Sequence, residues 1–272
     1  MTDLSERLNK TIGRHFVSLS CVQQFPADGG ERVHVFSGFV VEISGEWFYI
    51  TAGHILRDVG TALKAGSTFD VWRLGDQTAG HSFRNTGVPY AFDIGQWLVL
   101  EDEAAGLDYA TVHLGGLYRR QLEAGGIIPF QVDTWSDHTV PHDRWALIGI
   151  PTESVGYDGK TLITARIVVA PLTATGAPRL AGAKENNQFY AKLDDDPEEI
   201  VKDLVGMSGG PIVMLKHEKT WKYSIIGVQS GWYPALRIIA ACPIRSFIDA
   251  LRPIVEEALQ IAEGMKEGGS AK

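Results

Sequence analysis

Short runs rich in Val, Ile, Phe, Trp and Tyr alternate with clusters of Gly, Pro, Asn and Asp along most of the chain. Runs of this length and composition, bounded by turn residues, predict β-strands. The strand-like runs are FVSLSCVQQF, VHVFSGFVVEI, WFYITAGHIL, FDVWRL, IGQWLVL, YATVHL, WALIGI, LITARIVVA, GPIVMLK and YSIIGVQSGW. Antiparallel sheets made of many short strands must protect their edges, so the pattern favours a closed barrel or a sandwich.

The hydrophobic pattern changes near the C-terminus. Four apolar residues recur there at helical spacing, namely Ile244, Phe247, Ile248 and Leu251. Pro253 interrupts this pattern, and the apolar periodicity resumes at Ile254. Because proline is well tolerated in the first turn of a helix, we predict two helical pieces within about 244–266. The polar tail 267–272 is expected to be disordered.

Composition and charge narrow the classes of function. The chain has 272 residues, of which 44% are apolar and 21% charged, which is ordinary for a globular protein. A β-barrel protein of this length can form a single domain. The net charge is −8 and no basic stripe is present, which argues against nucleic-acid binding and against anionic membrane surfaces. The sequence also lacks the run of about 18 apolar residues that a membrane span needs.

The number of cysteines and the N-terminal sequence indicate the cellular compartment in which the protein is expected. The only cysteines are Cys21 and Cys242, which is few for a secreted protease of this size. The segment MTDLSERLNKTIG is polar and lacks the apolar stretch of a signal peptide. We therefore expect a cytoplasmic protein in which both cysteines are buried thiols. A single disulfide between them stays open as an alternative.

No cofactor and no metal site are expected. An acidic run follows Leu193 and consists of Asp194, Asp195, Asp196, Glu198 and Glu199. It lacks the glycine and the ligand spacing of a known calcium loop. We interpret it as the solvated start of a helix, where acidic residues are favourable.

The segment Gly206-Met207-Ser208-Gly209-Gly210-Pro211 carries the strongest chemical signal. It lies between a predicted loop and the predicted strand 212–215. Glycines around a serine allow backbone N–H groups to converge without obstruction by Cβ atoms. Such convergent donors form an oxyanion hole beside the hydroxyl. The alternative is a glycine-rich turn in an all-β protein.

A serine hydroxyl becomes an effective nucleophile when an adjacent base removes its proton. His54 is a candidate base, because it follows an apolar strand that ends in small residues, which leave the imidazole room to turn. A buried carboxylate must then hold the imidazole tautomer. Asp108 begins a predicted strand with apolar alternation, so its side chain can point into a cleft. Asp93 and Asp102 are rival candidates in less apolar surroundings.

Three blocks resemble the signature motifs of the trypsin-like serine peptidases, in that family's order of His, Asp and Ser. They are Thr51-Ala52-Gly53-His54, Asp108-Tyr109-Ala110 and Gly206-Met207-Ser208-Gly209-Gly210-Pro211. Ser37-Gly38-Phe39-Val40-Val41 is similar to the strand before the family's histidine. Ile226-Gly227-Val228-Gln229-Ser230-Gly231 resembles the strand that pairs with substrate backbone. The resemblance spans roughly residues 33–231.

This resemblance implies a mostly β fold with two antiparallel six-stranded β-barrels of the chymotrypsin type, followed by C-terminal helix. The active site of the family lies in the cleft between the barrels. Residues 1–272 would then form a single peptidase domain. Its N-terminal barrel would cover about 14–122 and its C-terminal barrel about 123–243.

The resemblance also assigns roles to residues. It implies a catalytic triad of His54, Asp108 and Ser208, with the backbone N–H groups of Gly206 and Ser208 as the oxyanion hole. The residues before the serine would form the base of the specificity pocket. The residues implied to bind substrate are Lys202, Asp203, Gln229, Ser230 and Gly231, of which the last three would pair with the peptide as an added strand.

The chain departs from the secreted members of the family at two informative positions. Met207 stands directly before the serine, where the digestive enzymes have an aspartate that pairs with a freshly cut N-terminus. Ile55 follows the histidine in place of a cysteine. The chain therefore resembles the disulfide-poor, bacterial-type branch. We expect that N-terminal cleavage does not activate it, and that packing of Met207 or a bound partner holds the oxyanion loop.

The predicted function is that of a serine endopeptidase that forms an acyl-enzyme on Ser208, with His54 as general acid and base and Asp108 orienting it. Its partners would be peptide or protein substrates. Two alternatives stay open. One is a protease-fold module that binds an extended peptide without cutting it. The other is an effector with little free activity, gated by a regulatory protein partner.

Overall fold

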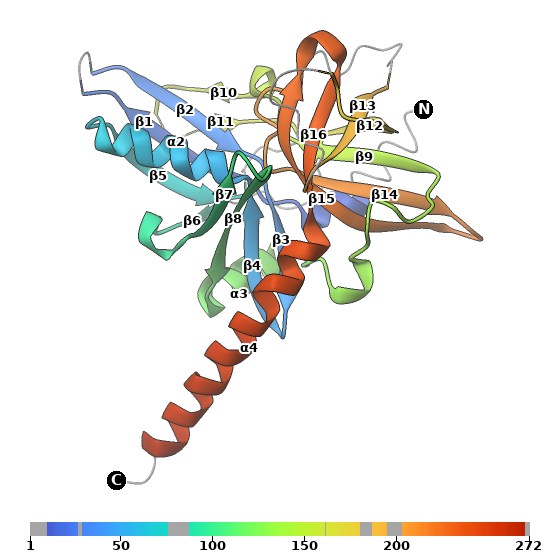
Figure 1. The fold of residues 1–272 in the computed structure, drawn as a ribbon. Helices are drawn as coiled ribbons and strands as arrows, with labels where there is room; N and C mark the ends of the chain where they lie inside the picture. The colour runs from blue at the N-terminus through green and yellow to red at the C-terminus, as the bar shows by residue number, and fades with distance from the viewer. Residues whose placement is uncertain are drawn as a thin grey trace.

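The computed structural model describes residues 10–26, 29–75, 87–160, 162–179, 187–194 and 203–269, with the side chains of the last helix described to residue 265. The described chain is mostly β, with one closed six-stranded barrel, two open four-stranded sheets and a long C-terminal helix (Figure 1). No helix in these ranges is long and apolar enough to cross a membrane. Lys202 and most of the acidic run after Asp194 lie outside the described residues.

The N-terminal half contains two antiparallel sheets. One has the order β2-β1-β5-β6 and consists of β1 (Leu19–Gln24), β2 (Glu31–Phe36), β5 (Thr68–Leu74) and β6 (Val88–Pro89). The other has the order β3-β4-β8-β7 and consists of β3 (Phe39–Ile43), β4 (Glu46–Thr51), β7 (Leu98–Asp102) and β8 (Leu107–Leu114). One apolar core joins them and includes Leu19, Val40, Tyr49, Leu74 and Val112.

The expected six-stranded barrel is therefore not closed in this half of the described chain. The run predicted as one strand, VHVFSGFVVEI, is divided between β2 and β3 at Ser37 and Gly38. The carbonyl and the hydroxyl of Ser37 form hydrogen bonds with groups outside the β2 and β3 strand pairing. Its carbonyl accepts from Thr51 Oγ1 at 2.8 Å, and its hydroxyl oxygen accepts from the Ile150 N–H at 3.0 Å. The chain leaves one sheet here and enters the other.

The C-terminal half contains the closed barrel, in agreement with the expected six strands. The strand order is β12-β13-β16-β15-β14-β9. Its strands are β9 (Arg144–Gly149), β12 (Val168–Thr175), β13 (Phe189–Leu193), β14 (Pro211–His217), β15 (Trp221–Tyr233) and β16 (Ile238–Pro243). Alternate residues fill the barrel interior, including Leu147, Ala191, Ile212, Ile226 and Ile239. A small hairpin of β10 (Gly156–Tyr157) and β11 (Ile163–Thr164) lies outside this ladder.

Two helices were absent from the sequence prediction. The run WFYITAGHIL was predicted as a strand, but only its first part belongs to β4, and α2 (Gly53–Lys64) begins before its end. Helix α2 buries Ile55, Leu56 and Val59, and the first two of these belong to the core of the N-terminal half. Helix α3 (Gly116–Ala124) follows β8. Short 3₁₀ turns occur at η1 (Gly13–His15), η2 (Ile94–Gln96), η3 (Val132–Thr134), η4 (Thr152–Ser154) and η5 (Pro234–Leu236).

The C-terminal segment is one helix, α4 (Ile244–Gly269), and the prediction of two pieces separated at Pro253 was wrong. A buried stripe continues across the proline and includes Ile244, Phe247, Ile248, Leu251 and Val255. Proline removes one backbone donor from a helix, but packing of this stripe on the body outweighs that cost. The distal half of α4 extends away from the body (Figure 1). The helix also includes residues 267–269, which were expected to be disordered.

A shared core holds the two halves together. It combines residues of β3 and β8 with residues of the barrel and of α4. Tyr109 on β8 stacks on Phe247 with ring centroids 4.5 Å apart, and its hydroxyl donates to the Pro243 carbonyl at 2.7 Å. The buried ring of His15 contacts the Ile128 carbonyl through Nδ1 at 2.9 Å and the Tyr223 hydroxyl through Nε2 at 2.8 Å. Burial lowers the pKa of His15 to about 4, so this link is neutral at pH 7.

Candidate active site

His54 and Asp108 are in direct contact. His54 lies in the first turn of α2, and Asp108 lies near the start of β8. The imidazole Nδ1 is 2.7 Å from Asp108 Oδ2, and the backbone N–H of His54 donates to Asp108 Oδ1 at 2.8 Å. The first N–H groups of a helix have no partner within the helix and carry partial positive charge. Asp108 therefore both caps α2 and orients the imidazole.

The surroundings of His54 act on its pKa in opposite directions. Burial disfavours the charged imidazolium and lowers the pKa. The hydrogen bond with Asp108 and the negative charge of that carboxylate favour the imidazolium and outweigh burial, so the pKa of His54 is raised above its ordinary value of 6.5. An imidazole in this position can accept a proton readily and carry it as a stabilised cation.

The rival carboxylates are engaged elsewhere. Asp93 is exposed and accepts from the Gly95 N–H and from the side-chain amide of Gln96. Asp102 is also exposed and accepts from the Ala105 N–H. Asp108 is only 8% exposed. The geometry thus pairs His54 with Asp108 and leaves both rivals in local turns.

The serine loop packs against the segment that leads to His54. Ser208 is half-buried, and the following Gly209 has a φ of +85°. A methyl group on Gly209 would lie 2.9 Å from the backbone nitrogen of Ala52, so this close approach requires glycine. In the described part of the chain, neither Ser208 Oγ nor His54 Nε2 has a hydrogen-bond partner. The structure therefore brings the serine loop and the histidine segment together, with neither of these two side-chain atoms engaged in a hydrogen bond among the described residues.

The predicted oxyanion donors are also unengaged. Within the described residues, the backbone N–H groups of Gly206 and Ser208 have no hydrogen-bond partner. The loop that carries them is held on both sides. Ser37 Oγ donates to the Gly206 carbonyl at 3.2 Å, and the Thr152 N–H donates to the Val205 carbonyl at 2.8 Å. Gly206 has a φ of +92°, and an added methyl would lie 2.9 Å from the Thr152 nitrogen.

Met207 is fully buried in the core of the barrel. Its side chain lies against Gly149, where an added methyl group would come within 2.9 Å of Met207 Cβ and 3.0 Å of Met207 Cε. Apolar packing therefore occupies the position directly before Ser208. This arrangement agrees with the expectation that Met207 packing holds the loop.

The structure separates the residues expected to bind substrate. Asp203 is half-buried, and its Oδ1 accepts from Trp232 Nε1 at 2.8 Å and from the Val205 N–H at 3.1 Å. Gln229 is fully buried, with its backbone groups bonded to Gly209 and Gly210, so it supports the serine loop and does not line the surface. Nothing in the sequence pattern pointed to the indole of Trp232 as a partner of Asp203.

A hollow of about 270 Å³ lies beside His54, between the two halves. Ser230 and Gly231, two of the residues that the sequence predicted to bind substrate, line it. It also contains charged residues that sequence reasoning missed, namely Arg57, Glu101 and Glu103. Arg57 and Glu101 form an ion pair. The only advance signal for these residues was their position next to the His and Asp motifs in the sequence.

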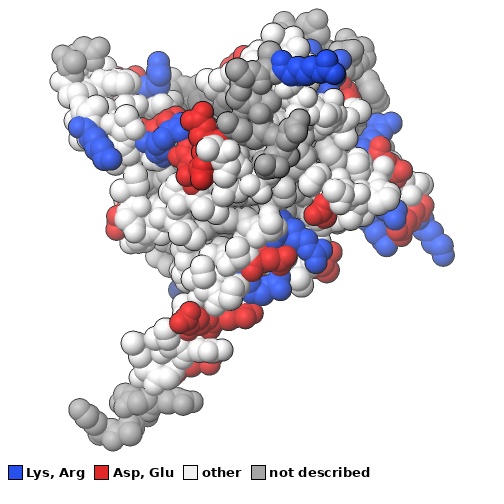
Figure 2. All heavy atoms as spheres, viewed as in Figure 1, with Lys and Arg blue, Asp and Glu red and all other residues white. Residues whose placement is uncertain are grey.

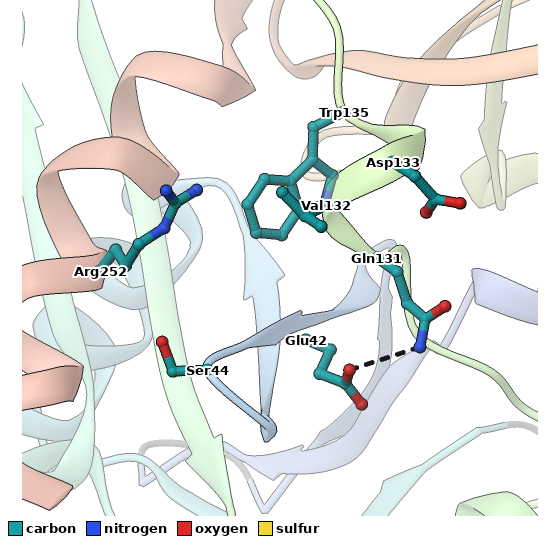
Figure 3. Close-up of a pocket in the computed structure, with 7 residues that line it drawn as sticks. All are labelled: Glu42, Ser44, Gln131, Val132, Asp133, Trp135 and Arg252. Atoms are coloured by element: carbon teal, nitrogen blue, oxygen red, sulfur yellow. Dashed lines mark hydrogen bonds between the residues drawn. The ribbon is translucent and has the colours of Figure 1, made fainter.

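A larger hollow of about 420 Å³ lies between α4 and the segment around η3, where the guanidinium of Arg252 stands 5.5 Å from the ring of Trp135 (Figure 3). Gln131 donates to Glu42 across it at 3.3 Å. None of the three triad candidates lines this hollow. Among the described residues, no group of three or more His, Cys, Asp or Glu side chains is placed to hold a metal ion.

Similar solved structures have the chymotrypsin fold. The scabies mite inactivated protease paralogue S-I1 is 12% identical with a TM-score of 0.52, over 90% of this chain and 95% of that chain. The scabies mite inactivated protease paralogue S-D1 is 11% identical with a TM-score of 0.51, over 90% and 94%. The protease Anisep from Arthrobacter nicotinovorans is 13% identical with a TM-score of 0.46, over 85% and 90%. No protein-family model matches the chain, and no curated protein matches it.

The chain contains only two cysteines. Both cysteines are buried and free, so the alternative of a disulfide between them is wrong. Identities of 11–12% show a shared fold but do not show a shared activity. The two scabies mite paralogues, which have TM-scores above 0.5, are inactivated proteases. The chain has the chymotrypsin fold of the trypsin-like serine proteases.

Proposed function

We propose that this protein is a serine endopeptidase with His54, Asp108 and Ser208 as its catalytic triad. The observation that carries the proposal is the 2.7 Å contact between His54 Nδ1 and Asp108 Oδ2. It occurs where the serine loop packs on the segment before His54, with the N–H groups of Gly206 and Ser208 unpaired in the described structure. The side chains and backbone donors needed for acyl transfer are thus supplied by one region.

The proposed chemistry follows from these positions. Ser208 Oγ attacks the scissile carbonyl while His54 Nε2 accepts the hydroxyl proton. The carbonyl oxygen becomes an oxyanion and accepts hydrogen bonds from the N–H groups of Gly206 and Ser208. His54 then protonates the leaving amine, which leaves an acyl-enzyme on Ser208. Water activated by His54 hydrolyses that ester and regenerates the hydroxyl.

A second candidate is a peptide-binding module or a partner-gated effector with little free activity. The observation that favours it is the missing hydrogen bond between Ser208 Oγ and His54 Nε2 in the described structure. Catalytic hydrogen bonds in substrate-free enzymes are often long and tighten only in the complex. The presence of all three triad side chains supports the active enzyme. The cytoplasmic location stays a prediction from the sequence.

The deciding experiment is labelling with a fluorophosphonate probe, read by mass spectrometry. Wild type should form an adduct on Ser208, and EDTA should leave the rate of labelling unchanged. Ser208→Ala should abolish the adduct and His54→Ala should nearly abolish it. Matched controls are Ser246→Ala and His113→Ala, both exposed, which should label as wild type.

Two outcomes would contradict the proposal. Wild type that remains unlabelled, alone and with extended peptides present, would favour the binding module. Labelling that is lost in EDTA and restored by zinc would point to metal chemistry.

A further inference from the structure

The hollow beside His54 has an acidic rim. Glu101 lies on β7, and Glu103 lies in the turn between β7 and β8. Arg57 pairs with Glu101, whereas the exposed carboxylate of Glu103 has no partner among the described residues. Asp108, the remaining acid of the hollow, is engaged by His54. Figure 2 shows acidic side chains gathered over this part of the molecule, beside a basic one.

The opposite wall of the hollow is the end of a strand with one free edge. Within the described chain, β14 pairs with β15 only up to Val228, and the continuation of β15 pairs only with β16. Ser230, Gly231 and Tyr233 of this continuation line the hollow. A free strand edge can accept an extended peptide as an additional strand. Ser230 and Gly231 bring only small side chains to this wall of the hollow.

The direction of such a peptide follows from the barrel, whose strand pairs are all antiparallel. Strand β15 touches the serine loop at Gln229, where the Gly209 N–H donates to the Gln229 carbonyl, and then runs away from it. An antiparallel peptide on the edge therefore runs toward Ser208. Its residues in the hollow lie on the N-terminal side of the bond to be cut.

We propose that this hollow selects substrates with a lysine or arginine shortly before the cleaved bond, bound chiefly by Glu103 with help from Glu101. The charged groups that face the hollow are Arg57, Glu101 and Glu103, together with the His54–Asp108 pair. Two carboxylates against one guanidinium leave an excess of negative charge. This inference rests on the proposed function, because it names the substrate class of the same site.

The test uses internally quenched peptide pools with lysine, norleucine or glutamate fixed at the second, third or fourth position before the cut. Wild type should cleave one lysine pool about two- to fivefold faster than its norleucine counterpart, which is the range of an exposed ion pair. Glu103→Gln should remove most of this preference. Arg57→Gln should increase it, because that change frees Glu101. The control Glu123→Gln, on α3, should leave it unchanged.

Fluorophosphonate labelling of every variant separates this inference from the proposed function. If wild type and the variants label but cleave the lysine and norleucine pools equally, the inference is overturned. The proposed endopeptidase function is then unaffected. If wild type does not label, fluorescence anisotropy with Ser208→Ala and the same peptides, made with fluorescein, tests the hollow directly. Tighter binding of lysine peptides that depends on Glu103 supports the inference, and equal binding of lysine and glutamate peptides overturns it.

Discussion

The protonation of His54 is governed by Asp108 at the level of single residues. Burial alone would lower the pKa of the imidazole, and the contact with Asp108 reverses the sign of the shift. In the proposed mechanism His54 must be neutral to accept the Ser208 proton, so we expect activity to be lost as the pH falls through this raised pKa. The pH-dependence of labelling therefore reports the His54–Asp108 contact.

Asp108→Asn removes the carboxylate charge that chiefly opposes the effect of burial on the pKa of His54. We expect kcat to fall on the order of 10⁴-fold, the cost of this change in a serine protease with the same triad. The midpoint of the acidic limb of probe labelling, above about 6.5 in wild type, should move to lower pH. Steady-state turnover of a peptide substrate measures kcat, and the rate of labelling across a pH series measures the midpoint. Near-wild-type activity in Asp108→Asn, with loss in Asp93→Asn or Asp102→Asn, would mean that another carboxylate serves His54.

Among the elements, α4 shows how packing overrides a local signal. Pro253 is exposed within the helix, while Leu251 and Val255 on either side of it are buried. A helix-interior proline lacks one N–H donor and strains the preceding turn. The apolar stripe that docks on the body keeps the helix continuous in spite of this strain.

Pro253→Ala should restore the missing donor and stabilise the protein by about 1–3 kcal/mol. Urea unfolding monitored by tryptophan fluorescence measures the free energy of unfolding. Gly264→Ala is the matched control, because position 264 has open space around it in the distal half of α4. That change should raise local helicity with little effect on global unfolding. A loss of stability in Pro253→Ala would mean that the helix requires the proline bend for docking.

For the molecule as a whole, the segment before β1 belongs to the core. Ile12 is fully buried, and Phe16 is only 2% exposed. His15 connects this segment to the loop at Ile128 and to β15 at Tyr223. The start of the described chain therefore joins both halves.

A variant that begins at Phe16 should lose several kcal/mol of stability, because removal of one buried aliphatic side chain such as Ile12 costs about 2–5 kcal/mol. We also expect no gain in kcat, since buried Met207 offers no carboxylate to a new α-amino group. Urea unfolding and active-site titration measure these quantities. A large gain in kcat that acetylation of the new terminus abolishes would show that N-terminal activation operates after all.

Local sequence was sufficient for features that depend on near neighbours. Periodicity of two and flanking turn residues located most strands, and helical spacing located the start of α4. The motif around Ser208 carried enough glycine to predict converging backbone donors. The histidine and serine blocks, together with their order, predicted the chymotrypsin fold.

Tertiary structure decided what depends on residues far apart in the chain. The sequence favoured Asp108 over Asp93 and Asp102, but the contact of its carboxylate with His54 required the N-terminus of α2 to meet β8. The separation of β2 from β3 at Ser37 depends on hydrogen bonds with Thr51 and Ile150. The acidic hollow forms only where the two halves pack together. The local preference of Pro253 predicted an interruption of the C-terminal helix. Packing of the buried stripe of α4 on the core keeps that helix continuous. Long-range packing is the larger free-energy contribution at these positions, so sequence periodicity could not predict them.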